Sequence, residues 1–320
     1  MIGLRPSHGE TTPQGTFDMT AQQIVLSLVL AVMVFSVALE LRVEDFRRVA
    51  QMPRSVVCGL IPQFILLPVG TWVATLLLSL PPNTEAAMLL VAACPGGSLS
   101  NVITHYGRGN TALSVSISAV ASLLALVLTP LNFGWMISTN PDTASWLRAL
   151  EIDPRGIWLS LLFILAAPMA LGLWLRHRRP DTTAKLQKPL ANFSLLALLA
   201  FIVLGLIRER HLLTAALVPQ LLLVVLHNAG GLFLGWLSAV VMQLPEGDRR
   251  AVMIEGGMQN SGLALGIIAV QFQADLGMVI VASLWGIWHI VSGMALAVLW
   301  RRKDARADAA TRVPHTAHGP

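Results

Sequence analysis

The sequence predicts an all-α polytopic membrane protein with about nine transmembrane helices. The 320-residue chain is 55% hydrophobic and only 12% charged, whereas an ordinary soluble domain carries about 25% charged residues. Its mean hydropathy is +0.67, and its charges lie in short clusters between long apolar runs. So few charges cannot cover a soluble exterior. The composition therefore excludes a soluble enzyme, a disordered chain and a nucleic-acid-binding domain, despite a net charge of +5.

The apolar runs themselves give the predicted spans. A membrane-spanning helix needs about 20 mostly apolar residues, and proline- and asparagine-rich breaks such as Pro81-Pro82-Asn83 separate several of the runs. The predicted spans lie near residues 20–40, 55–80, 84–106, 111–138, 156–176, 189–207, 213–242, 249–272 and 275–300.

The distribution of Lys and Arg predicts the orientation, because cytoplasmic loops carry more of both. The basic loops follow the first, third, fifth and seventh spans, and the basic segment after Trp300 lies on the same side. We expect an extracytoplasmic N-terminal segment over residues 1–19, a transmembrane domain over 20–300 and a disordered cytoplasmic tail over 301–320. The odd number of spans agrees with this arrangement.

Two predicted spans are interrupted by polar and helix-breaking residues. Span 84–106 contains the run Cys94–Asn101, with Pro95 and two glycines, and span 249–272 contains Glu255–Gly262. Proline removes a backbone donor and glycine weakens a helix. Unwound backbone at membrane depth is tolerated where it is buried in protein or lines a cavity. A pair of such spans in two halves of a chain indicates a transporter site, and their opposite directions suggest an inverted repeat.

Glu255 is the candidate hub of that site. A carboxylate at the centre of a membrane helix costs about 2.5–3.5 kcal/mol on insertion scales, so it needs partners. One interpretation is a protonated glutamic acid that bonds to a neighbouring helix. The other is a cation site, because Ser100 and Asn101 in one broken span and Gln259 and Asn260 in the other supply oxygen, which hard cations prefer. A single carboxylate among neutral oxygens favours Na+ over a divalent ion.

Other polar side chains in apolar runs have both a structural and a functional interpretation. Gln63, Ser114 and Ser118 suit either helix packing or ion binding. His227 and His289 are more typical of interhelical hydrogen bonds than of a proton relay, and no His/Cys spacing indicates a zinc site.

Several of these motifs resemble the bile acid:sodium symporter family, from about Val34 to Trp300. The resemblance is carried by two long crossing motifs and by shorter matches: Cys94–Asn101 with Gly107–Asn110 and Leu113–Ser116, Glu255–Ser261, Gly59–Pro68, Leu226–Asn228 and Trp288–His289.

This resemblance implies a panel domain and a core domain built by inverted repeats, with two broken helices that cross near mid-membrane. It implies two sodium sites and a substrate site beside the crossing. The first sodium site would comprise Ser100, Asn101, Ser114, Ser118 and Glu255. The second would comprise Gln63, Glu255 and Gln259 with the carbonyls of Gly256 and Met258. Substrate would contact Ser98, Asn260 and His289. Ile290 follows His289 where bacterial members tend to carry Asn, so the substrate stays open.

The predicted function is therefore Na+-coupled symport of an organic anion across the bacterial inner membrane by alternating access. The anion would be bile-acid-like or a small carboxylate or sulfonate. The expected partners are this anion, two Na+ ions and the lipid bilayer, with no nucleic acid, and a monomer suffices. A proton-coupled or uncoupled carrier of the same fold is the alternative. An intramembrane serine protease is disfavoured, because it gives no role to Glu255 in a second interrupted span.

Overall fold

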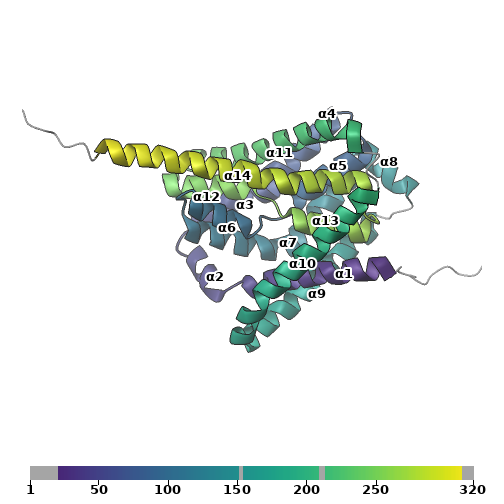
Figure 1. Ribbon diagram of the computed structural model, residues 1–320, viewed down its shortest axis with the longest axis horizontal. Helices are drawn as coiled ribbons and strands as arrows, with labels where there is room; N and C mark the ends of the chain where they lie inside the picture. The colour runs from purple at the N-terminus through teal and green to yellow at the C-terminus, as the bar shows by residue number, and fades with distance from the viewer. Residues whose placement is uncertain (1–20, 151–153, 209–212, 312–320) are drawn as a thin grey trace, which may run out of the picture.

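The computed structural model describes residues 21–150, 154–208 and 213–311, and within these ranges the regular structure is helical apart from one isolated bridge (Figure 1). Apolar runs of helix length, bounded by proline or asparagine, account for this. The helices are α1 (Ala21–Glu40), α2 (Val43–Val49), α3 (Pro53–Ile61), the π-helix η1 (Pro62–Leu66), α4 (Leu67–Leu77), α5 (Pro82–Ala93), α6 (Leu99–Tyr106), α7 (Thr111–Thr139), α8 (Pro141–Ala149), α9 (Pro154–Arg178), α10 (Pro180–Arg208), α11 (Leu213–Val241), α12 (Glu246–Gly257), α13 (Ser261–Gln271) and α14 (Leu276–Thr311).

Several of the described helices are long and apolar enough to cross a membrane. Five pass on length and composition: Pro53–Leu77, Thr111–Thr139, Trp158–Arg178, Leu217–Val241 and Leu276–Ala307. The pair Ile24–Glu40 and Val43–Val49, bent by 65°, makes a sixth if it is counted as one span. The chain is thus a multi-pass helical membrane protein.

Two breaks between helices lie within the segments 84–106 and 249–272. Helix α5 ends at Ala93, Cys94 is extended, and α6 begins at Leu99. Helix α12 ends at Gly257, and α13 begins at Ser261 after the non-helical residues Met258 and Asn260. Pro95 cannot donate a helical hydrogen bond, and the two glycines Gly256 and Gly257 weaken the end of α12. The backbones of the two non-helical segments meet.

The core of the molecule surrounds these breaks. Helix α5 is buried from Thr84 to Ala93, and its apolar side chains share one cluster with those of α1, α7, α9, α13 and α14. Helix α1 packs against α9 and α10, and α11 packs along α12. In the α11–α12 contact a Cβ on Gly231 would lie 2.7 Å from the carbonyl oxygen of Gly256, so small residues permit this close approach.

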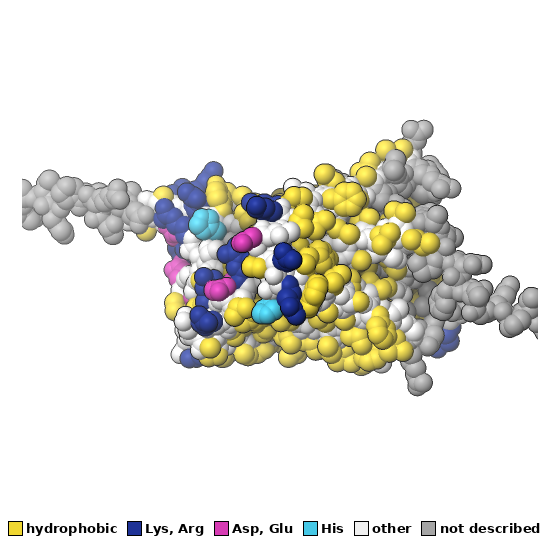
Figure 2. Space-filling view, turned by 90° about the horizontal axis from the view of Figure 1, so that it is seen from below, with side chains coloured by type: hydrophobic (Ala, Val, Ile, Leu, Met, Phe, Trp, Pro, Cys, Tyr) yellow, Lys and Arg dark blue, Asp and Glu magenta, His cyan; other side chains and the backbone are white. Residues whose placement is uncertain are grey.

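The basic loops gather at one end of the molecule, where Figure 2 shows the Lys and Arg side chains beside a broad hydrophobic zone. Hydrogen bonds join these loops: Arg54 donates to the carbonyl of Met242, and the amide of Asn110 donates to the carbonyl of Gly247. The predicted orientation places these Lys- and Arg-rich loops on one side of the membrane, and they lie together in the structure. Most of the opposing basic residues, including Arg5, Arg155 and Arg210, lie outside the described residues or side chains.

The segment after Trp300 differs from the expected disorder. Helix α14 continues through Arg301 and ends at Thr311, and residues 312–320 lie outside the described part of the chain. Alanine and arginine favour a helix, and Asp304 is held by a buried arginine, so this stretch has a tertiary partner that its polar composition did not suggest.

Candidate functional site

The two interrupted spans meet backbone to backbone at the centre of the fold. The amide of Asn260 donates a 2.7 Å hydrogen bond to the carbonyl of Pro95, and Gly96 pairs with Gln259 in an antiparallel bridge. These bonds satisfy backbone groups that the helix breaks leave open, as buried polar groups require. The crossing is therefore fixed without a helix running through it.

Glu255 lies beside this crossing with its carboxylate fully buried. Its Oε1 accepts hydrogen bonds from the hydroxyls of Ser100 at 2.6 Å, Ser114 at 2.5 Å and Ser118 at 3.0 Å. Its Oε2 accepts from the Nε2 of Gln63 at 3.2 Å. Four residues from three segments thus converge on one carboxylate that the sequence singled out.

This cluster holds more acceptors than protons. Each serine hydroxyl has one proton, yet Ser114 lies 2.8 Å from the Oδ1 of Asn101 as well as beside Glu255, and Ser100 lies 2.7 Å from the carbonyl of Gly97. The hydroxyl of Ser118 approaches Asn101, Ser100 and both carboxylate oxygens. The surplus of oxygen lone pairs around one negative charge is the chemistry that holds a hard monovalent cation.

Gln63 joins the cluster from a local widening of its helix. It lies in the π-helix that begins at Pro62, a distortion common at functional sites. Its Nε2 also donates a 3.0 Å hydrogen bond to the backbone carbonyl of Glu255, and its Oε1 lies 3.5 Å from the amide of Gly96. Proline at the first position of this turn cannot donate a helical hydrogen bond, and the turn is a π-turn in place of an α-turn.

A second group of polar atoms surrounds Gly96. A Cβ on Gly96 would lie 2.9 Å from the Oε2 of Glu255, 3.1 Å from the Nε2 of Gln63 and 3.3 Å from the carbonyl of Met258. The side chain of Gln259 is buried, and neither atom of its amide has a hydrogen-bond partner among the described residues. Such an orphaned amide suits an ion-binding role.

Gly256 is placed differently from the other members of the predicted second site. Its carbonyl oxygen lies against Gly231 of α11, and the described contacts do not join it to Gln63. Asn228 donates a 2.7 Å hydrogen bond to the carbonyl of Gly257, the last residue of α12, so α11 holds the end of the helix that carries Glu255.

The donor set resembles no transition-metal site. In the described part of the chain, no group of three or more His, Cys, Asp or Glu side chains is placed to hold a metal ion. Glu255 contributes one carboxylate, and its other neighbours are neutral oxygens and an amide. This composition fits an alkali ion.

Two of the three predicted substrate residues lie at the crossing. Ser98 precedes α6 and lies within hydrogen-bonding reach of Glu40, at the end of α1. Asn260 caps α13, because its Oδ1 accepts a 2.9 Å hydrogen bond from the backbone amide of Leu263. Asn260 and Pro95 line a cavity that is otherwise bounded by side chains of α1, α7, α9 and α13.

His289 lies apart from that pair. It contacts Trp285 in α14, whose carbonyl accepts a hydrogen bond from its Nδ1 at 2.9 Å, and its described contacts include neither Ser98 nor Asn260.

His227, which also contacts Trp285, is held in one tautomer. The indole of Trp285 donates to its Nδ1 at 2.9 Å, so its Nε2 carries the proton and donates to Thr71 at 2.7 Å. His227 and His289 thus make interhelical or local hydrogen bonds, as the structural interpretation predicts.

The helix ends at the crossing carry opposite partial charges. Helices α5 and α12 end there, and α6 and α13 begin there. Helix C-termini favour cations and N-termini favour anions. The sequence did not single out Gly96, which borders Glu255 and Gln63. A glycine directly after Pro95 is the signal that marks such a close approach.

Membrane-spanning helices around two broken, crossing spans, with unwound backbone buried in protein, define the molecule as a secondary transporter. The comparison with known proteins agrees. Residues 27–216 match the Sodium Bile acid symporter family, and the chain belongs to this family.

Three relatives show how far the similarity extends. The chain is 30% identical over 289 residues to the uncharacterized sodium-dependent transporter YocS of Bacillus subtilis, covering 90% of this chain and 86% of the relative. It is 28% identical over 276 residues to the probable sodium/metabolite cotransporter BASS1 of Arabidopsis thaliana, covering 85% and 66%. It is 28% identical over 254 residues to the human ileal sodium/bile acid cotransporter, covering 78% and 70%. The chain is thus a transport protein of a sodium-dependent family and not an enzyme.

Proposed function

We propose that the protein is a secondary active transporter that couples the entry of Na+ to the uptake of an organic anion by alternating access. The single observation that carries this proposal is the buried carboxylate of Glu255, surrounded by three serine hydroxyls at 2.5–3.0 Å. The names of the relatives, which are sodium-dependent transporters or sodium cotransporters, support the choice of ion.

Two Na+ ions would bind around Glu255. The first would use the cluster of Ser100, Asn101, Ser114 and Ser118 with Oε1. The second would use Gln63, Oε2 and the carbonyl of Met258, with the orphaned amide of Gln259 turning toward the ion. The surplus of acceptors supports the first site, and the narrow space at Gly96 supports the second. The resemblance adds the carbonyl of Gly256, which would have to reorient to take part.

The anion would bind at the other side of the crossing. Ser98 and Asn260 stand at the starts of α6 and α13, whose positive ends and open amide groups favour a carboxylate or sulfonate. The cavity beside Asn260 is lined by Met33, Val37, Leu165 and Met169, which suits an apolar body attached to the anionic group. His289 would contribute from α14 only after a rearrangement.

Alternating access would come from movement between two domains. Helices α1, α9 and α10 would form the panel, and the remaining spans would form a core of inverted repeats, giving nine spans with the N-terminus outside and the C-terminus in the cytoplasm. The cavity lies between α1 and α9 on one side and the crossing on the other, where such a movement would open or close it. A monomer contains all the residues required, and the bacterial inner membrane would be its location.

The proposed stoichiometry gives a sufficient driving force. Two Na+ ions and a monovalent anion carry one net positive charge inward, which gains about 2.3 kcal/mol per 100 mV of membrane potential. A tenfold Na+ gradient adds about 1.4 kcal/mol per ion. Together these terms support accumulation of the anion by roughly a thousandfold or more.

The runner-up is a proton-coupled carrier in which Glu255 exchanges a proton. Its carboxylate could be a hydrogen-bond donor within the same cluster. Both ring nitrogens of His227 are engaged by Trp285 and Thr71, and the surplus of acceptors around Glu255 favours a metal cation over a proton.

Purified protein tests the proposal directly. We expect NaCl, and not choline chloride at equal ionic strength, to raise the midpoint temperature of thermal unfolding, because an ion that binds only the folded state stabilises it. In proteoliposomes an inward Na+ gradient at fixed pH should drive uptake of labelled taurocholate or of a small carboxylate such as pantoate. Uptake driven by a proton gradient without Na+, together with no thermal response to Na+, would establish the runner-up instead.

A further inference from the structure

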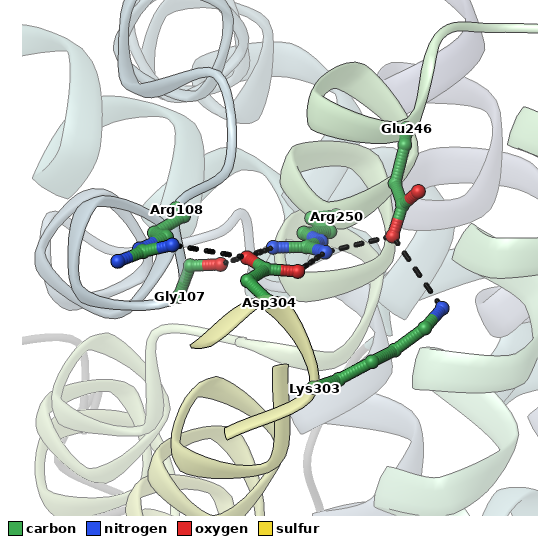
Figure 3. A network of polar contacts seen from close by, with 6 residues as sticks. All are labelled: Gly107, Arg108, Glu246, Arg250, Lys303 and Asp304. Atoms are coloured by element: carbon green, nitrogen blue, oxygen red, sulfur yellow. Dashed lines mark hydrogen bonds and ion pairs between the residues drawn. The ribbon is translucent and has the colours of Figure 1, made fainter. Parts of the chain in front are cut away.

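A buried guanidinium connects three elements at the charged end of the molecule (Figure 3). Arg250 of α12 is only 7% exposed. It donates two hydrogen bonds of 2.7 Å to Asp304 of α14, one of 2.7 Å to Glu246 and one of 3.0 Å to the carbonyl of Gly107. It also lies over the ring of Trp300, 5.5 Å from the centroid. A buried arginine is tolerated only with such partners.

The charges around Arg250 are closely balanced. Arg108 lies 3.9 Å from Asp304, and Lys303 lies 3.8 Å from Glu246 (Figure 3). The hydrogen bond from Arg250 lowers the pKa of Glu246 below its usual range, so this carboxylate stays charged at neutral pH. Arg250 therefore holds its partners as an ion network and does not present an isolated positive charge toward the Na+ cluster.

From its place on α12, Arg250 reaches the end of α6, the other half-helix that builds this cluster. Gly107 directly follows α6, the helix that carries Ser100. Glu255 follows Arg250 along α12 by roughly 7.5 Å of helix axis. At their other ends α6 and α12 lie near the crossing, where Asn260 bonds Pro95. The two half-helices are thus connected at both ends, with the serine–glutamate contact between the connections.

Helix α6 depends on such connections because it is short. It has 8 residues, and isolated helices of this length are marginal in water even with good helix formers. The Cβ that Gly107 lacks would lie 2.9 Å from the ring of Trp300, so the end of α6 also packs closely on α14. The bidentate Arg250–Asp304 contact fixes this arrangement, since paired guanidinium–carboxylate bonds are strong and directional.

We infer that Arg250 and Asp304 are positioning residues for the sodium site: they hold α6 and α12 at the separation at which Ser100 reaches Glu255. This inference rests on the proposed function. Without the pair, Na+ binding must itself order α6, so the Na+ affinity falls while saturating Na+ still restores the bound state. The extension of α14 beyond its apolar part then contributes to Na+ binding, because it carries Asp304.

The test is a Na+ titration of the thermal unfolding midpoint of the purified full-length protein, with choline replacing Na+. We compare wild type with Arg250→Gln and Asp304→Asn, and we use Arg302→Gln, an exposed arginine on the same helix, as the matched control for loss of charge. The half-saturating Na+ concentration should rise about tenfold in the first two variants, a typical coupling between sites, and stay unchanged in the control. The double variant should be no worse than Arg250→Gln alone, because Asp304→Asn removes a contact that Arg250→Gln has already removed.

A lower melting temperature alone does not support the inference, because any stabilising ion pair would give it. An unchanged half-saturating Na+ concentration in Asp304→Asn overturns the inference; this variant keeps the shape of the side chain and leaves Arg250 its bonds to Glu246 and Gly107, so it is the safer one for folding. A wild-type protein that shows no response to Na+ overturns the proposed function instead, so the two failures are distinguishable.

Discussion

Gly96 pairs with Gln259 across the meeting point of two broken helices, and the space where a side chain on Gly96 would lie is bordered by Glu255, Gln63 and the carbonyl of Met258. These close neighbours leave no room for a side chain at position 96, so glycine is required there. The proposed second ion site borders the space that a side chain would fill. This relationship allows the site to be blocked without removal of any ligand.

We expect Gly96→Ala to weaken Na+ binding by at least about tenfold, which corresponds to 1.4 kcal/mol. The added methyl group would lie 2.9 Å from the Oε2 of Glu255, so either the carboxylate or the backbone must move. The measurement is the Na+ dependence of initial uptake in proteoliposomes. Gly70→Ala is the matched control, because a Cβ on Gly70 meets nothing within 4 Å. Equal Na+ dependence in the two variants would contradict a second site at Gly96.

We expect Glu255→Ala to abolish Na+-dependent uptake while the protein still reaches the membrane. The variant removes the only carboxylate of the cluster and leaves the hydroxyls of Ser100, Ser114 and Ser118 without their shared acceptor. Glu255→Gln keeps the shape and removes only the charge, and it should lose the Na+ response of the unfolding midpoint as well. Glu44→Gln, an exposed change on α2, serves as the control. Undiminished Na+-driven uptake in Glu255→Ala would eliminate Glu255 as the ion ligand.

Much of this site was predictable from the sequence because it depends on local breaks in long apolar runs. Pro95 with its two glycines marks one interruption, and Glu255 with Gly256 and Gly257 marks the other. A carboxylate at membrane depth demands partners, so the hub was recognisable before its neighbours. Gln63 was recognisable as a buried amide, whereas the π-helix that turns it toward Glu255 depends on packing against other helices.

The contacts between distant segments were not predictable in the same way. Asp304 and Arg250 each lie in polar stretches that are typical of solvent-exposed segments, and only the fold brings them together. The sequence therefore predicts disorder where α14 extends as a helix. His289 shows the opposite case. The family resemblance suggested a substrate contact at His289, whereas the carbonyl of Trp285 one turn earlier accepts a hydrogen bond from its Nδ1.

We expect Gln63→Ala to raise the half-saturating Na+ concentration more than it lowers the maximal rate. The amide holds the backbone carbonyl and the carboxylate of Glu255 at 3.0 and 3.2 Å, so its loss loosens the ion site, and high Na+ compensates. Uptake measured over a range of Na+ concentrations separates the two parameters. Gln51→Ala, at an exposed turn, should change neither. A Gln63→Ala variant with wild-type Na+ dependence would remove this residue from the site.

The close contact between α11 and α12 offers a test of the fold with adjacent matched variants. A Cβ on Gly231 would lie 2.7 Å from the carbonyl oxygen of Gly256, whereas a Cβ on Gly230 meets nothing within 4 Å. Gly231→Ala should therefore destabilise the protein by about 1–3 kcal/mol through overpacking, while Gly230→Ala should be neutral or stabilising by up to about 1 kcal/mol, because alanine favours a helix. Thermal unfolding in detergent without Na+ measures both. Because the contact borders the helix that carries Glu255, Gly231→Ala should also weaken the stabilisation by Na+, and Gly230→Ala should not. Equal unfolding midpoints for the two variants would mean that α11 and α12 do not pack at these glycines.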